Sequence, residues 1–308
     1  MIVAAVLAGS LIGLYFVHKK VFLGPRGDRI PKASFGDGKF DQEIAELTAQ
    51  MKARDYEEIF IESYDGKRLR AKLYRGREGA PVNICCHGYR GLGVRDYCAM
   101  GKYLIEKGDN VILIDHRAHG GSQGRTICYG IKERFDVQRW AYKAAEMFGE
   151  DTDIYLYGIS MGAATVLMTS SLELPGNVRA ILADCPYSSP REIIRSVARG
   201  MGLPVGVVYP LIWLAGIVWG AVRIPKHFSA ANEVKKTQIP ILIIHGEDDS
   251  FVPAYMSEQI AQSNPAKVER RTFENADHGL SYLVDRERYL RIVEDFLKRT
   301  QSKASGKT

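Results

Sequence analysis

The chain has 308 residues, of which 46% are hydrophobic and 25% are charged, and its formal net charge is +6. This is ordinary globular composition, long enough for one large domain with a full core. The basic residues form no stripe interleaved with aromatic residues, so no nucleic-acid partner is expected. The five cysteines have no metal-like spacing and are odd in number, which favours free thiols in a reducing compartment. Neither a metal nor a cofactor is expected.

The first 17 residues are almost wholly apolar, and they predict a transmembrane anchor over residues 1–23. At about 1.5 Å per residue they span roughly 25 Å, near the lower limit for a bilayer. The segment lacks a charged start and a convincing cleavage site, which disfavours a signal peptide. His18, Lys19 and Lys20 follow it, so the positive-inside rule places the rest of the chain in the cytoplasm. A surface-exposed domain behind an uncleaved signal anchor is the alternative.

A linker and an amphipathic helix are predicted over residues 24–55. Residues 24–39 combine glycine, proline and alternating charge, as linkers do. Ile44, Leu47 and Met51 have helical spacing, which predicts a helix over residues 40–54 that lies on the domain. The globular domain is expected over residues 56–300, with a flexible basic tail over residues 301–308.

An apolar strand is predicted over residues 81–86, and His87-Gly88-Tyr89 follows it. A His-Gly loop of this kind exposes backbone N–H groups, which can stabilise a developing oxyanion. The Tyr89 N–H is the candidate donor. The His87 side chain is expected to form structural hydrogen bonds rather than to act as a base.

The segment from Gly158 to Gly162 reads Gly-Ile-Ser-Met-Gly and is the most informative stretch of the chain. It follows an apolar strand predicted over residues 153–157 and precedes a predicted helix that starts at residue 163. Such a tight strand-to-helix turn holds its serine in a strained conformation, and the flanking glycines leave room for it. The pattern predicts that Ser160 is a nucleophile and that the Met161 N–H is the other oxyanion donor.

Residues 187–236 read as a helical cap inserted between two core strands. The stretch over residues 201–222 carries no charge, yet a membrane span there would separate the two ends of the domain and is rejected. Pro204, Pro210 and internal glycines predict short broken helices instead. Tyr209, Trp213 and Trp219 are candidates for contact with an apolar substrate, although packing within the cap explains them equally well.

The serine needs a base, and the base needs an orienting acid. One chain order in serine hydrolases is serine, then acid, then histidine. Past the apolar strand over residues 239–245 come Asp248 and Asp249, and the last histidine is His278. That order selects His278 as the base. The spacing leaves both aspartates open, and Asp184, after the strand over residues 179–183, is a more remote candidate.

Taken in order, these segments resemble the α/β-hydrolase superfamily. The chain is most similar to bacterial hydrolases of the serine-aminopeptidase-like and monoacylglycerol-lipase-like type, over about residues 56–297. The motifs that carry the resemblance are Ser63-Tyr64-Asp65-Gly66, His87-Gly88, Asp115 to Ser122, Gly158 to Gly162, His245-Gly246 to Val252-Pro253, and Asp277-His278-Gly279. In the family's His-Gly-x-x-Asp-x-x-Val-Pro pattern the acid falls on Asp249. The resemblance implies a mostly parallel sheet with helices on both faces and a helical cap.

The expected function is a membrane-anchored serine hydrolase that cleaves carboxylic esters of medium or long acyl chains. Ser160, His278 and Asp249 would form its triad, and no cofactor would be needed. A peptidase or a thioesterase could use the same machinery. A protein of another class, a non-catalytic lipid-binding or scaffold protein on the same fold, is the remaining alternative.

Overall fold

The computed structural model describes residues 2–25, 27–28 and 38–304. Its centre is an eight-stranded sheet in the order β1-β2-β4-β3-β5-β6-β7-β8. The strands are β1 (Glu57–Glu62), β2 (Arg68–Tyr74), β3 (Val82–Cys86), β4 (Asn110–Ile114), β5 (Ile154–Ile159), β6 (Val178–Asp184), β7 (Ile241–Gly246) and β8 (Val268–Phe273). β1 and β2 pair antiparallel, as do β2 and β4, and every neighbouring pair from β4 to β8 is parallel.

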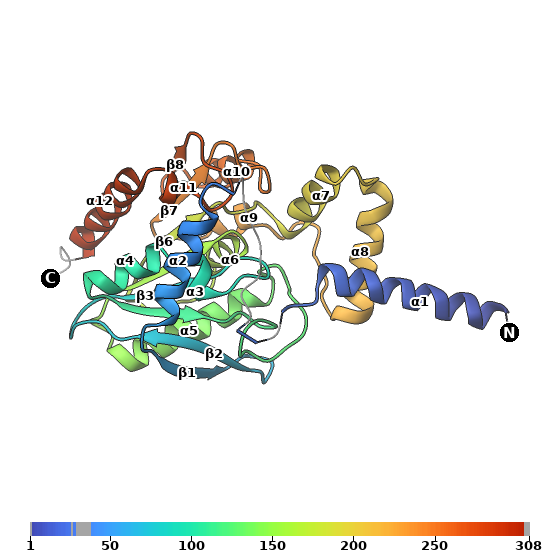
Figure 1. Cartoon of the computed structure of the whole chain (residues 1–308), viewed down its shortest axis with the longest axis horizontal. Helices are drawn as coiled ribbons and strands as arrows, with labels where there is room; N and C mark the ends of the chain where they lie inside the picture. The colour runs from blue at the N-terminus through green and yellow to red at the C-terminus, as the bar shows by residue number, and fades with distance from the viewer. Residues whose placement is uncertain (1, 26, 29–37, 305–308) are drawn as a thin grey trace.

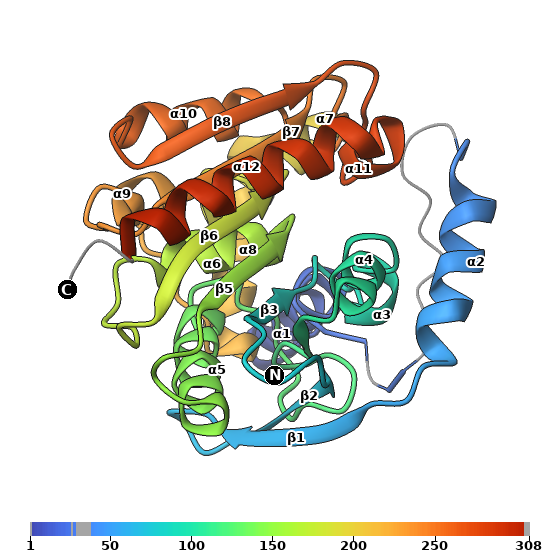
Figure 2. The same cartoon turned by 90° about the vertical axis from the view of Figure 1, so that its left-hand side faces the viewer.

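Helices cover both faces of this sheet, and others lie away from it at one end of the molecule (Figure 1). They are α1 (Ile2–Val21), α2 (Asp41–Lys52), α3 (Gly93–Asp96), α4 (Met100–Lys107), α5 (Glu133–Phe148), α6 (Met161–Thr169), α7 (Pro190–Gly200), α8 (Val205–Gly220), α9 (Ala230–Val234), α10 (Tyr255–Ser263), α11 (Ser281–Val284) and α12 (Arg286–Ala304). The buried side chains of α5 and α6 share one core cluster, and those of α4 and α12 share another. Figure 2 shows how these helices are arranged around the sheet. The fold is therefore the predicted mostly parallel sheet between two helical layers.

The strand β3 shows why the sheet is covered on both sides. All five of its residues are buried, with Ile84 and Cys86 in the cluster of α5 and α6 and Cys85 in the other. Successive side chains of a strand point to opposite faces, so a mostly apolar strand suits a sheet that is buried on both faces. All five cysteines of the chain are free and buried, as expected, while the compartment remains a prediction.

The N-terminal segment is helical, but the predicted transmembrane anchor is not supported. Among the described residues no helix is long and apolar enough to cross a membrane. α1 has His18, Lys19 and Lys20 in its last turn, which end its apolar run.

The second half of α1 lies against the rest of the molecule. The ring of Phe22, which follows α1, is completely buried, and α1 packs along α8. Past it, Leu23 and Gly27 form isolated bridges to Thr126 and Gly120, so the start of the predicted linker follows the domain surface. Most of that linker, residue 26 and residues 29–37, lies outside the described residues. α12 continues to Ala304, and residues 305–308 of the predicted tail are likewise outside them.

Three helices, α7 to α9, lie within residues 187–236, and the role of this segment as a cap stays a prediction. The stretch predicted as short broken helices differs, because α8 runs without interruption over 16 residues with Pro210 inside it. Pro210 lies in the second turn, where its ring removes one early hydrogen bond without ending the helix. Pro204 is the N-cap residue, a position at which the missing N–H costs little.

Candidate active site

Ser160 sits at the turn between β5 and α6 with φ = 55° and ψ = −114°. A positive φ is uncommon for any residue with a side chain, so the strained turn predicted from the sequence is present. The flanking glycines are required by close packing. A Cβ on Gly162 would lie 1.9 Å from the Cys86 carbonyl oxygen, and one on Gly158 would lie 2.4 Å from the backbone of Gly162. The turn therefore holds the Ser160 hydroxyl above the ends of the parallel strands.

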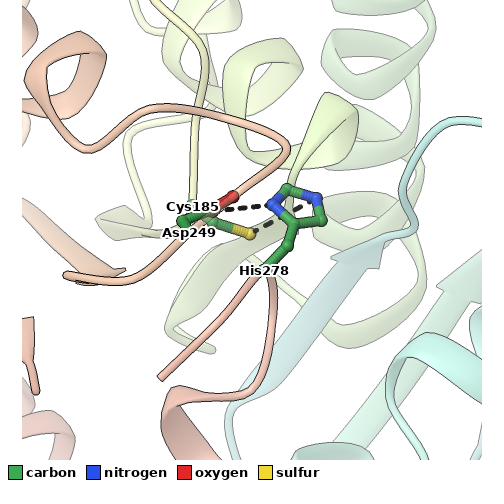
Figure 3. Close-up of side chains that lie close together, drawn as sticks. All are labelled: Cys185, Asp249 and His278. Carbon is green, nitrogen blue, oxygen red and sulfur yellow. Dashed lines mark hydrogen bonds and ion pairs between the residues drawn. The ribbon is translucent and has the colours of Figure 1, made fainter. Parts of the chain in front are cut away.

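A continuous chain of hydrogen bonds joins three predicted residues. The Ser160 Oγ lies 2.9 Å from His278 Nε2, and His278 Nδ1 lies 2.7 Å from Asp249 Oδ2. The three side chains come from the turn after β5, the loop after β8 and the loop after β7, and Figure 3 shows Asp249 pointing at the imidazole ring. All three residues are buried.

The other two acids considered in the sequence do not contact the histidine ring. Asp248 is exposed, and its backbone N–H donates to the Ala276 carbonyl. Asp184 is buried, but its Oδ2 accepts a hydrogen bond from the Tyr289 hydroxyl at 3.0 Å. The structure therefore brings Asp249, and neither alternative, to His278.

Several donors converge on the Asp249 carboxylate. Its Oδ1 accepts the N–H groups of Phe251 and Val252 at 3.0 and 2.7 Å, and His245 Nε2 lies 3.1 Å from its Oδ2. Burial opposes ionisation of Asp249, but the interactions with His278 and His245 outweigh it and hold the pKa of this carboxyl well below its usual range. Asp249 is therefore a fixed negative charge that can orient the His278 ring and stabilise its protonated form.

The two predicted oxyanion donors come from different segments of the chain. The Met161 N–H opens α6, and Tyr89 is in the loop after β3. Among the described residues, neither N–H donates to another protein group. The neighbouring Gly88 N–H, in contrast, donates to Asp96 Oδ2 at 2.8 Å. Arg90, the residue after Tyr89, has φ = 55°. Its N–H donates to His119 Nε2 at 3.1 Å, and this hydrogen bond holds the backbone of the loop at Arg90.

A cavity of about 400 Å³ opens beside Ser160 and His278. It extends between the loop after β3, the α3–α4 region and α11, as far as Ile44 on α2. Apolar side chains dominate its wall; among them are Ile44, Met100, Ile159, Phe251, Leu280 and Leu283. Arg90, Arg95 and Asp96 add charge next to the oxyanion loop. A volume in this range suits a small-molecule or acyl-chain site.

The three predicted cap contacts lie elsewhere. Tyr209, Trp213 and Trp219 are on α8 and do not line this cavity. The Trp219 indole N–H donates to the Leu11 carbonyl of α1 at 3.2 Å, and its ring packs against Tyr15 with centroids 5.3 Å apart. Their role in substrate contact stays a prediction, and for Trp219 the structure shows a packing contact.

Within the described part of the chain, one group of side chains has its possible ligand atoms close enough together to hold a metal ion. It consists of Cys185, Asp249 and His278, drawn in Figure 3. Both ring nitrogens of His278 are already engaged with Asp249 and Ser160, and Cys185 Sγ lies 3.9 Å from Nε2. Burial raises the pKa of the Cys185 thiol well above its usual value, which disfavours the thiolate that a metal requires. The group is therefore two members of the hydrogen-bonded triad together with a neighbouring thiol.

Sequence reasoning missed three residues that support the site. His245 is completely buried and bonds both Asp249 and the Val252 carbonyl. Its place at the end of an apolar strand, four residues before the acid, was the available signal. Asp96 holds the oxyanion loop through Gly88, and Arg90 holds it through Leu23, which is distant in sequence; no local pattern indicated either contact.

Comparisons with known proteins bear on the fold of the chain. Residues 81–203 match the family described as alpha/beta hydrolase fold. The chain is 26% identical over 296 residues to the uncharacterized protein YqkD of Bacillus subtilis, and the match covers 96% of this chain and 94% of that one. It is also 26% identical over 193 residues to the lysophosphatidylserine lipase ABHD12 of Gallus gallus, which covers 58% of this chain and 46% of the lipase.

Solved structures show the same architecture. The esterase Pf2001 of Pyrococcus furiosus superposes with a TM-score of 0.67 at 21% identity, covering 91% of this chain and 98% of the esterase. The esterase EaEST of Exiguobacterium antarcticum superposes with a TM-score of 0.59 at 18% identity, covering 79% and 100% of the two chains. The chain has the α/β-hydrolase fold.

Proposed function

We propose that this protein is a serine hydrolase that cleaves carboxylic esters with apolar acyl chains. The observation that carries the proposal is the hydrogen-bonded chain from Asp249 through His278 to Ser160, which opens on a largely apolar cavity. A nucleophile, a base within 2.9 Å and an orienting carboxylate are the groups that acyl transfer requires.

In the first half of the reaction, Ser160 Oγ attacks the ester carbonyl carbon while His278 Nε2 takes the hydroxyl proton. The carbonyl oxygen becomes an oxyanion, and the N–H groups of Tyr89 and Met161 donate to it. The resulting imidazolium is stabilised by the ionised Asp249. His278 then returns its proton to the alcohol oxygen as the carbon–oxygen bond breaks, which leaves the acyl group on Ser160.

In the second half, a water molecule attacks the acyl-enzyme carbonyl. His278 removes one proton from that water and delivers it to Ser160 Oγ as the acyl–serine bond breaks. The same oxyanion donors act again. The products are the alcohol and the carboxylic acid, and Ser160 is regenerated with its proton.

The cavity supports an acyl group with a long apolar part. It begins at Ser160 and its wall is mainly apolar as far as Ile44 on α2, while Arg90, Arg95 and Asp96 lie near the oxyanion loop. An ester with an apolar chain and a polar or charged alcohol group fits this distribution. The partial similarity to a lysophosphatidylserine lipase supports testing lysophospholipids among the substrates.

The test is ester hydrolysis by the purified full chain over an acyl series from acetyl to palmitoyl, with lysophosphatidylserine included. Ser160→Ala is the matched control, because it removes one oxygen atom and keeps the fold. We expect turnover that rises with chain length and falls at least a thousandfold in the variant. Turnover of thioesters or peptides but not of esters would contradict the substrate class, and lipid binding without any Ser160-dependent turnover would contradict the enzyme.

A second variant tests whether the cavity holds the acyl chain. Ala99 lines the cavity, whereas Ala49 on α2 is exposed and does not. Ala99→Leu is expected to shift the preferred acyl chain toward shorter lengths, because the larger side chain fills part of the volume. Ala49→Leu should leave the preference unchanged. An unchanged optimum in both variants would place the acyl chain outside this cavity.

A further inference from the structure

The helices α1 and α8 carry a large exposed apolar surface. Figure 1 shows them together at one end of the molecule, away from the sheet, with α7 beside them. We call this surface the apolar paddle and define it by exposed side chains of α1, α8 and the turn before α8. They are Leu11, Ile12, Tyr15, Phe16, Met201, Leu203, Val207, Leu211, Trp213, Leu214, Ile217, Val218 and Trp219, each at least 37% exposed.

The two helices bury one narrow stripe between them. On α8 the buried residues are Ile212, Ala215, Gly216 and Gly220. The glycines allow close approach, because a Cβ on Gly216 would lie 3.0 Å from the Phe22 ring. This stripe holds the pair together and leaves the other sides of α8 exposed.

A helix that is apolar on every side is normally buried in a core or in lipid. The stretch from Met201 to Val222 contains no charged residue, and α8 nevertheless lies at the surface. Soluble monomers rarely expose contiguous apolar patches larger than a few hundred Å², and larger patches mark interaction surfaces. The paddle therefore requires an apolar partner.

Basic residues flank the paddle along the chain. From residue 187 to residue 228 the chain carries Arg191, Arg195, Arg199, Arg223 and Lys226, against the single acid Glu192. Lys19 and Lys20 are exposed at the end of α1. Among the described residues, Lys19, Lys20, Arg223 and Lys226 form no ion pair with a carboxylate. An apolar face with a cationic border is complementary to a lipid surface with anionic headgroups.

The root of the paddle touches the candidate active site. Arg90, in the oxyanion loop, donates through Nη2 to the carbonyls of Lys20 and Leu23 at 2.9 and 3.0 Å. The Tyr89 hydroxyl donates to the Val21 carbonyl at 2.8 Å. A lipid bilayer in contact with the paddle would therefore lie near the loop that is proposed to bind the oxyanion.

We propose that the apolar paddle docks on an anionic lipid bilayer and lies in the interfacial layer of one leaflet. The 16 residues of α8 extend about 24 Å, and both ends of the helix return to the hydrolase domain, so the helix lies along the surface. The apolar side chains enter the acyl boundary, and the basic border contacts the headgroups. The inference is independent of the proposed chemistry.

The experiment is vesicle co-sedimentation of the full chain, with phosphatidylcholine vesicles compared with vesicles that contain 30% phosphatidylglycerol. Two of the three tryptophans, Trp213 and Trp219, are on the paddle, whereas Trp140 is buried. Binding should therefore shift the tryptophan emission to the blue. We expect at least tenfold stronger binding to the anionic vesicles. Lys19→Gln and Lys20→Gln should each weaken it about fivefold, the factor that corresponds to about 1 kcal/mol per charge.

The decisive variant is Leu211→Ser combined with Val218→Ser, which keeps both paddle tryptophans as reporters. Its vesicle binding should fall at least tenfold, while its circular dichroism spectrum and its urea unfolding midpoint stay unchanged and show that the domain is folded. Tyr142→Ser on α5 is the matched control, since Tyr142 is 45% exposed, as is Leu211. It should bind like the unmodified chain.

Three outcomes would overturn the proposal. The first is no binding to anionic vesicles, and the second is binding that the double variant leaves intact, which would assign it to another segment. The third is a lipid-free dimer that the double variant converts to a monomer, without vesicle binding; the paddle would then be a contact between two copies of this chain. Ser160→Ala should bind vesicles normally, so this proposal and the hydrolase proposal can fail separately.

Discussion

The buried carboxyl of Asp184 gives a pH-dependent prediction about stability. Asp184 ends β6 directly behind the nucleophile turn, and the Tyr289 hydroxyl is the donor to its Oδ2. Burial outweighs this hydrogen bond and the nearby histidines and raises its pKa from 3.8 to about 6. The folded state therefore favours the protonated form. The stability that this provides is present below about pH 4 and is lost as the pH rises through 6.

Asp184→Asn removes the titration and keeps an oxygen that can accept from Tyr289. Each pH unit between the folded and unfolded pKa corresponds to about 1.4 kcal/mol, so the cost of ionised Asp184 reaches about 3 kcal/mol at pH 7.5 and about 1 kcal/mol at pH 4.5. The stability of the variant relative to the unmodified chain should therefore rise by about 2 kcal/mol between these two pH values. Urea unfolding of both proteins at each pH measures this difference.

Comparing the two pH values removes any constant cost of the new amide, such as an unsatisfied N–H group. Asp248→Asn is the control, because Asp248 is exposed and its replacement should change stability by less than about 0.5 kcal/mol at either pH. A stability difference for Asp184→Asn that is the same at pH 4.5 and 7.5 would refute the reasoning. Retained esterase activity in Asp184→Asn would also support Asp249 as the triad acid.

The remaining predictions concern the triad acid, the nucleophile turn and the oxyanion loop. Asp249→Asn should lower kcat by about 10⁴ because the imidazole loses its orienting charge, whereas Asp248→Asn should change it less than twofold in the same ester assay. Gly162→Ala should destabilise the fold by about 3 kcal/mol or more in urea unfolding, because its Cβ would lie 1.9 Å from a backbone oxygen. Gly206→Ala is the control; its Cβ meets open space, so it should be neutral or slightly stabilising. Arg90→Ala should lower kcat about tenfold and leave KM for a short ester unchanged, because the oxyanion loop loses its contacts with the end of α1. Arg90→Lys should recover part of the lost kcat. Equal kcat in Arg90→Ala and the unmodified chain would show that the loop keeps its position without this side chain.

Much of the fold and of the site was predictable from local patterns. Apolar runs flanked by turn residues predicted the central strands, and the Gly-x-Ser-x-Gly turn predicted the strained Ser160 that the structure shows. The order of serine, acid and histidine along the chain was sufficient to select His278. These features depend on residues that are close in sequence, or on the order of residues along the chain.

Other features depended on packing between distant segments. The spacing alone left Asp248 and Asp249 open, and only the resemblance to the α/β-hydrolases favoured Asp249. In the structure, packing decides which of the two side chains turns inward to His278 and His245. The cap aromatics were candidates for substrate contact, with packing as an equal alternative; the cavity lies between α3, α4 and α11, and Trp219 packs on α1. The position of the cap aromatics could not follow from hydropathy, because an apolar side chain packs equally well against a substrate or another helix.

The N-terminal segment shows most clearly which features the sequence determines and which the tertiary structure decides. Its composition determined that residues 2–21 form an apolar helix that ends in basic residues. The sequence did not reveal that the root of this helix is held by Arg90 and Tyr89, or that its second half pairs with α8. Hydrophobic burial is non-directional, so the sequence determines that such a helix must contact apolar surroundings, and only the tertiary structure decides which surface supplies them.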